Sequence, residues 1–141
     1  DTITPDQFTA VKDSYQIVKA LDRTWVTQGK MVFEAIFSLA PEALQLYPFK
    51  DDCGEEYKRK LGQHASGVMR YVEVALNKWG TPEGDDFLKD LGKRHVGYNV
   101  MRDHYAIVGI AILQTLERAL GGKWTPELKA YWGVVYTGME Q

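Results

Sequence analysis

The sequence predicts an all-α fold, and three observations lead to that prediction. Apolar residues recur at intervals of three and four through most of the 141 residues, which is the spacing of one helix face. No segment alternates between apolar and polar residues over the length of a strand. Thr-Pro occurs at 4–5, 81–82 and 125–126 and marks helix starts, because threonine caps free N–H groups and proline fits the first turn.

Each apolar stripe marks one helix, so about six or seven helices are expected in one domain, residues 1–141. Asp6, Glu83 and Glu127 place negative charge in the first turn after the three Thr-Pro pairs, where it complements the helix dipole. The polar segment 48–54 is expected to be a loop. In chain order the stripes cover residues 8–18, 32–40, 41–47 (a short turn of helix), 55–79, 87–95, 105–120 and 128–139.

Composition excludes several classes of protein. The chain has 17 basic and 19 acidic residues, a net charge of −2, and no basic stripe, so nucleic-acid binding is not expected. No apolar run reaches the length of about 18 residues that suggests a membrane span. Because the start, DTITPDQF, is polar, a signal peptide is not expected in these residues. Cys53 is the single cysteine. An intramolecular disulfide and a cysteine zinc site are therefore excluded, and a reducing, cytoplasmic location is favoured.

Two of the three histidines lie on apolar stripes. His64 follows Leu61 by three residues and His95 follows Leu91 by four, so both are expected to face the core. They are 31 residues apart, which leaves room for a turn and a second helix, and the two rings can meet across a cavity. His104 lies in a polar segment and is expected on the surface or at a helix cap.

The surroundings of the two histidines favour one cofactor over other chemistry. Zinc needs three or four nitrogen, sulfur or oxygen ligands, and no carboxylate lies on either stripe near the rings. Ser66 is not in a nucleophile elbow, so a serine hydrolase is not indicated. Haem needs one axial histidine and an apolar slot. Spacing alone leaves haem binding and two unrelated core histidines both open.

The order of several segments resembles the globin family. Residues 91–100, LGKRHVGYNV, resemble the segment of the proximal histidine, and residues 64–69, HASGVM, resemble the distal segment. Residues 29–47, with Pro41, are similar to the B and C helices, and the segments 103–121 and 124–132 resemble the G and H helices. The resemblance covers nearly the whole chain and is strongest to neuroglobin-like, invertebrate and bacterial single-domain globins. It implies the globin fold, a three-over-three helical sandwich, here with a short or absent D helix.

The resemblance also implies a cofactor and its ligands. The expected group is haem b (iron protoporphyrin IX), held by Nε2 of His95 as the proximal ligand. His64 is the distal histidine, and it either donates a hydrogen bond to bound O2 or coordinates the iron itself. Leu91 and Val100 are expected on the proximal side. The remaining expected pocket residues are Phe33, Phe37, Tyr47, Phe49, Val68 and Tyr105.

Two positions depart from the family pattern. Tyr47 aligns with a phenylalanine that packs on the haem in relatives, and Phe49 follows two residues later, so either ring can take that place; Tyr47 is favoured. Gly67 stands where many relatives carry a cation for a haem propionate. Lys60 or Arg94 is the residue that we consider for the contact with the propionate instead.

The expected function is reversible binding of O2, for transport, storage or sensing, with NO, CO or nitrite as further ligands. The alternatives are NO dioxygenation, nitrite reduction, weak peroxidase activity, or electron transfer through a bis-histidine haem, for which an external reductase would be needed. Some NO-dioxygenating relatives have tyrosine at the position of Phe33, so Phe33 counts against NO dioxygenation. A haem-free interaction protein is a further alternative. The chain is expected to be a monomer or a small homo-oligomer.

Overall fold

The computed structural model describes residues 2–97 and 102–140, and within these ranges it contains helices, turns and no strand. This confirms the predicted all-α class. No helix lies between residues 47 and 53, so the predicted loop and the absence of a D helix are also confirmed. The elements are α1 (Pro5–Lys19), α2 (Val26–Leu39), η1 (Pro41–Leu46), α3 (Gly54–Asn77), α4 (Pro82–Gly97), α5 (Arg102–Leu120), η2 (Gly121–Lys123) and α6 (Pro126–Glu140).

Threonine caps begin three of the helices, as predicted. The Thr4 hydroxyl accepts the Gln7 N–H at 3.2 Å, and the Gln7 side chain accepts the Thr4 N–H at 3.0 Å, which completes a capping box on α1. Thr81 and Thr125 likewise each accept the N–H of the residue three positions later, at 3.1 Å. Local sequence therefore determines where α1, α4 and α6 begin.

Helix α2 begins differently, six residues before its predicted stripe. Trp25, just before the helix, has a φ of 67°, in the left-handed region. The Asp22 carboxylate accepts the Thr24 hydroxyl at 2.7 Å and the N–H groups of Thr24 at 3.0 Å and Thr27 at 2.9 Å. These donors, the Thr24 hydroxyl foremost, hold the pKa of Asp22 well below its usual range. The Trp25 ring stacks on Tyr15 with centroids 4.5 Å apart. Asp22 thus supplies the cap, and buried ring packing supports the unusual backbone.

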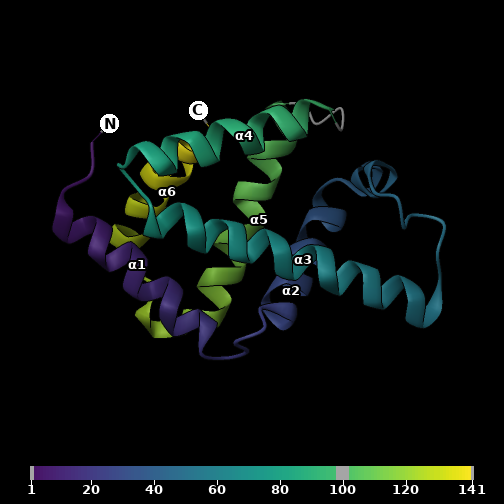
Figure 1. Cartoon of the computed structure of the whole chain (residues 1–141). Helices are drawn as coiled ribbons and strands as arrows, with labels where there is room; N and C mark the ends of the chain where they lie inside the picture. Colours follow the sequence, from purple (N-terminus) through teal and green to yellow (C-terminus); the bar gives the residue numbers. More distant parts are fainter. Residues whose placement is uncertain (1, 98–101, 141) are drawn as a thin grey trace.

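The helices form two layers around one core. Figure 1 shows α1, α3 and α4 in front, with α2, α5 and α6 behind them. Helix α2 makes its main contacts with α3 and α5. Gly29 permits the first of these contacts, since a Cβ there would lie 2.7 Å from the backbone of Ala65. At Gly67, by contrast, no described atom would lie within 4 Å of an added Cβ.

Buried aromatic side chains tie α1 to α3 in its own layer and to α6 in the other layer. Trp25 and Trp132 are each 1% exposed and Tyr15 is fully buried. The Tyr15 hydroxyl donates to the Met69 carbonyl at 2.8 Å, and the Trp132 Nε1 donates to the Ser14 hydroxyl at 2.9 Å. The buried polar tips of Tyr15 and Trp132 therefore have partners, as burial usually requires, whereas the buried Trp25 Nε1 has none among the described residues.

Candidate functional site

His64 lies within a cluster of aromatic rings. Its imidazole contacts Tyr47 at a centroid distance of 4.9 Å, Phe33 at 5.4 Å and Phe49 at 6.2 Å, all with rings steeply inclined to one another. Phe37 packs edge-on against both Phe33, at 5.8 Å, and Tyr47, at 6.1 Å. These five residues are called the aromatic cluster below.

Three elements bring the aromatic cluster together. Phe33 and Phe37 are four residues apart in α2 and so share one face of that helix. The short helix η1 reverses the chain and delivers Tyr47 directly after Leu46. Helix α3 then carries His64 past these rings. The corner between η1 and α3 is held by an ion pair between Lys60 and Asp52 at 2.8 Å.

Tyr47 and Phe49 occupy different places in the aromatic cluster. Phe49 is 4% exposed and stacks on Tyr47 with centroids 5.4 Å apart. Tyr47 is half-buried and lies closer to His64. Burial raises the pKa of the Tyr47 hydroxyl to about 12, so the group is neutral at physiological pH. Of the two rings, Tyr47 is therefore the one with surface left to contact a ligand.

His64 differs from expectation in its exposure. The sequence predicted that it faces the core, yet the residue is exposed. The physical reason is that its three neighbouring rings lie toward α2 and η1 and cover only part of the imidazole. His64 thus lies at the border between the core and the surface of the described chain.

The other predicted site residues divide into described and undescribed positions. Val68, Leu91 and Tyr105 are all half-buried. Val68 packs against the core, and the Tyr105 carbonyl accepts the Tyr136 hydroxyl at 2.6 Å. His95 falls within α4, but its side chain, like Val100 as a whole, lies outside the described residues.

The predicted set missed several residues next to the site. Leu61 and Val72 lie on the same face of α3 as His64 and are half-buried against the core. Their spacing of three or four residues from His64 and Val68 could have identified them.

The residues present fit a haem better than a bare metal ion. No group of three or more His, Cys, Asp or Glu in the described ranges can hold a metal ion. The aromatic cluster instead combines one imidazole and one neutral hydroxyl with apolar rings. A single nitrogen donor in an apolar setting is the donor set that haem iron requires.

Comparison with known families identifies the chain. A family model described as Globin matches residues 30–140. The chain belongs to the globin family. Membership of that family implies haem binding. Separately, no helix within the described ranges is long and apolar enough to cross a membrane.

Relatives of this globin come from animals and plants. Neuroglobin of Dissostichus mawsoni is 29% identical over 124 residues, which cover 84% of this chain and 78% of that protein. An anaerobic nitrite reductase of Gossypium hirsutum is 31% identical over 139 residues, covering 94% and 83%. Leghemoglobin-1 of Vicia faba is 35% identical over 113 residues, covering 77% and 76%.

Solved structures agree on the fold. A Drosophila melanogaster globin superposes with a TM-score of 0.82 at 20% identity, covering 97% of this globin and 90% of that chain. A second Drosophila structure, described as a hexa-coordinate haemoglobin with bound cyanide, gives a TM-score of 0.83 at the same identity and coverage. The predicted globin fold is therefore confirmed.

Proposed function

We propose that this globin binds haem b and takes up O2 reversibly, with His95 as the proximal ligand. The observation that carries the proposal is the aromatic cluster, which packs three apolar rings and Tyr47 around one exposed imidazole. When bound, the haem iron supplies the gas-binding chemistry. The chain supplies an apolar surface that excludes water and one polar group on the distal side.

The proposed role of His95 follows from its place in α4. A neutral imidazole is the form that binds iron, and a hydrogen-bond acceptor at the other ring nitrogen sets its tautomer. Leu91, one turn earlier and half-buried, is proposed to pack on the proximal side. Val100, after the end of α4, is proposed to complete that side.

The proposed role of His64 is to donate a hydrogen bond to O2, whose partial negative charge strengthens such a bond. Tyr47 and Phe33 hold the imidazole by edge contacts and limit its rotation. Val68, one turn later in α3, and Tyr105 in α5 are proposed as further walls of the pocket.

A second candidate function is nitrite reduction or another redox reaction through a haem held by both histidines. Two observations support this candidate. Two relatives are named anaerobic nitrite reductase, and one structural neighbour is named a hexa-coordinate haemoglobin. In this candidate His64 binds the iron and an external reductase supplies electrons. NO, CO and nitrite are the further ligands that both candidates predict.

The visible absorption spectrum of the dithionite-reduced protein under argon tests both candidates. One broad visible band in the wild type indicates five-coordinate iron, and it supports O2 binding with His64 free to donate. Two sharp bands that disappear in His64→Leu indicate that His64 binds the iron, and they favour the redox candidate. His104→Leu is the matched control, because it removes a histidine outside the aromatic cluster. A protein that shows no haem spectrum after haem is supplied contradicts the proposal.

A further inference from the structure

A hollow rich in positive charge lies where α2 crosses α3, away from the aromatic cluster. It has a volume of about 470 Å³ and is lined by four cationic side chains and one carboxylate. The cations are Lys30 from α2 and Lys58, Arg59 and Arg70 from α3; the carboxylate is Glu55. This surface, called the basic hollow below, carries a surplus of three positive charges (4 − 1) on a chain whose net charge is −2.

The basic hollow is separate from the proposed haem site. Gly62 and Ser66 line it, and His64 lies two residues from each of them. Two residues correspond to about 200° around a helix, so His64 is on the opposite side of α3. The hollow therefore does not serve the haem propionates, and its cations need a different explanation.

Two of the four cations have no carboxylate partner within the described chain. Lys58 pairs with Glu55 at 3.5 Å and Arg59 with Glu56 at 2.6 Å, whereas the ion pairs of the described residues include neither Lys30 nor Arg70. Arg70 reaches a backbone carbonyl, that of Thr24, at 3.5 Å. The charges of Lys30 and Arg70 are thus available to an anion from solution.

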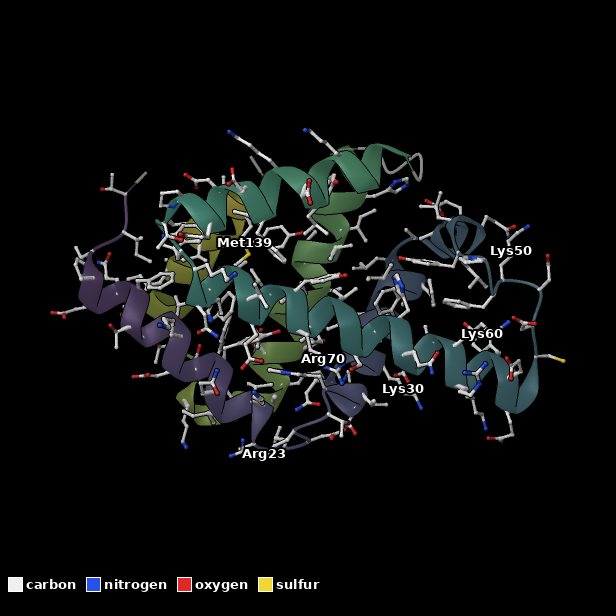
Figure 2. All side chains as sticks on the ribbon, in the orientation of Figure 1. Arg23, Lys30, Lys50, Lys60, Arg70 and Met139 are labelled. Carbon is white, nitrogen blue, oxygen red and sulfur yellow. The ribbon has the colours of Figure 1, made fainter. Side chains whose placement is uncertain are left out.

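The backbone keeps the hollow open between these two charges. Gly62 is buried and has no side chain. A Cβ added at Gly62 would lie 3.4 Å from the Lys30 Cε. Lys30 therefore leans from α2 across toward α3. Figure 2 shows Lys30 and Arg70 along the same edge of α3, with Arg23 below them in the loop that leads into α2.

We propose that the basic hollow binds a polyphosphate anion, the group shared by inorganic pyrophosphate and nucleotide diphosphates. Two linked phosphate groups can meet the two cations without a carboxylate partner, Lys30 and Arg70, while Lys58 and Arg59 add positive charge beside them. Arginine forks bind phosphate oxygens in pairs, and lysine adds a point charge. The volume lies within the range of roughly 300–1,000 Å³ that is typical of small-molecule sites.

Isothermal titration calorimetry of the haem-loaded full chain, in phosphate-free buffer of low ionic strength, tests this proposal with sodium pyrophosphate and with ADP. Both are expected to bind, and sodium chloride is expected to weaken binding by screening. Lys30→Gln with Arg70→Gln should weaken it about ten-fold or more, because two charged hydrogen-bond donors are lost. Glu55→Gln should tighten it, because the repelling carboxylate is gone. Tighter binding of ADP than of pyrophosphate would identify a nucleotide as the source.

The matched control is Lys129→Gln with Arg118→Gln, which removes the same charge from exposed positions on α6 and α5. Circular dichroism establishes that each variant keeps its helices. If the Lys30 and Arg70 double variant does not fold, Arg70→Gln alone, at an exposed position, takes its place. Absence of pyrophosphate binding to the wild type overturns the proposal, and so does equal weakening in the control.

Discussion

At the scale of single residues, Tyr47 is the departure from the family pattern with the clearest physical consequence. Its ring contacts Phe33, Phe37, Phe49 and His64, so it takes part in most contacts of the aromatic cluster. Its hydroxyl is withdrawn from water, and burial raises its pKa to about 12. The neutral ring packs well, whereas a phenolate at this place would be poorly solvated.

The raised pKa of Tyr47 predicts a loss of stability in alkali. Below pH 10 both folded and unfolded chains keep the proton; between pH 10 and 12 the unfolded chain loses it first, so the free energy of unfolding falls as pH rises. We expect the free energy of unfolding of Tyr47→Phe to decrease by about 1–2 kcal/mol less than that of the wild type over this pH range. The difference is modest because Tyr47 is only half-buried. Urea unfolding at several pH values, followed by circular dichroism, measures it.

Tyr131→Phe is the control for that measurement, because Tyr131 lies in α6, outside the aromatic cluster. Tyr15 and Tyr105, whose pKa values burial also raises, are present in both variants. An alkaline loss in Tyr47→Phe equal to that of the wild type would contradict the burial of this hydroxyl.

At the scale of elements, the crossing of α2 and α3 positions both sites. The two helices touch where Gly29 meets Ala65, one residue after His64. Phe33, one turn along α2 from Gly29, then reaches the imidazole. The same crossing aligns Lys30 with the opposite face of α3. A change in the spacing of these helices should therefore affect the aromatic cluster and the basic hollow together.

Gly29→Ala tests that crossing. Its Cβ would lie 2.7 Å from the Ala65 backbone, which cannot move aside without separating the helices, so we expect a loss of about 1–3 kcal/mol in the free energy of unfolding. Gly133→Ala in α6 is the control, because no described atom lies within 4 Å of its Cβ. It should be neutral or stabilising by about 0.5–1 kcal/mol. Equal effects in chemical denaturation would show that the crossing tolerates a methyl group.

At the scale of the whole molecule, the haem is expected to stabilise the fold. The proposed site draws residues from α2, the η1–α3 corner, α3, α4 and α5, so a bound haem would join both layers. A ligand that binds only the folded state adds about 2.7 kcal/mol at a hundred-fold excess over its Kd. Removal of haem should therefore lower the thermal midpoint by roughly 5–10 °C.

Differential scanning calorimetry of haem-loaded and haem-free protein measures this shift. We expect His95→Ala to lose most of it, because the proposed iron ligand is gone, and His104→Ala to keep it. A midpoint that is the same with and without haem would contradict a haem that joins the layers.

Much of the helix pattern could be predicted because its causes are local. The Thr-Pro pairs start α1, α4 and α6 through hydrogen bonds to the next turn, and the apolar spacing of each stripe is a property of one segment. The start of α2 was not predicted, because the apolar stripe begins only at residue 32, the cap is Asp22, and the left-handed Trp25 is supported by Tyr15 in another helix. The exposure of His64 was also missed, since it depends on how far the rings of α2 and η1 reach.

The sequence by itself determined the helical class and the residues at which α1, α4 and α6 begin. Periodicity and capping are interactions between residues a few positions apart, so they are readable along the chain. Only the tertiary structure decided that Tyr47 is nearer to His64 than Phe49, and that Lys30 and Arg70 line one hollow. These neighbours come from helices far apart in sequence, and their contacts depend on the close approach of α2 and α3, which no local pattern encodes.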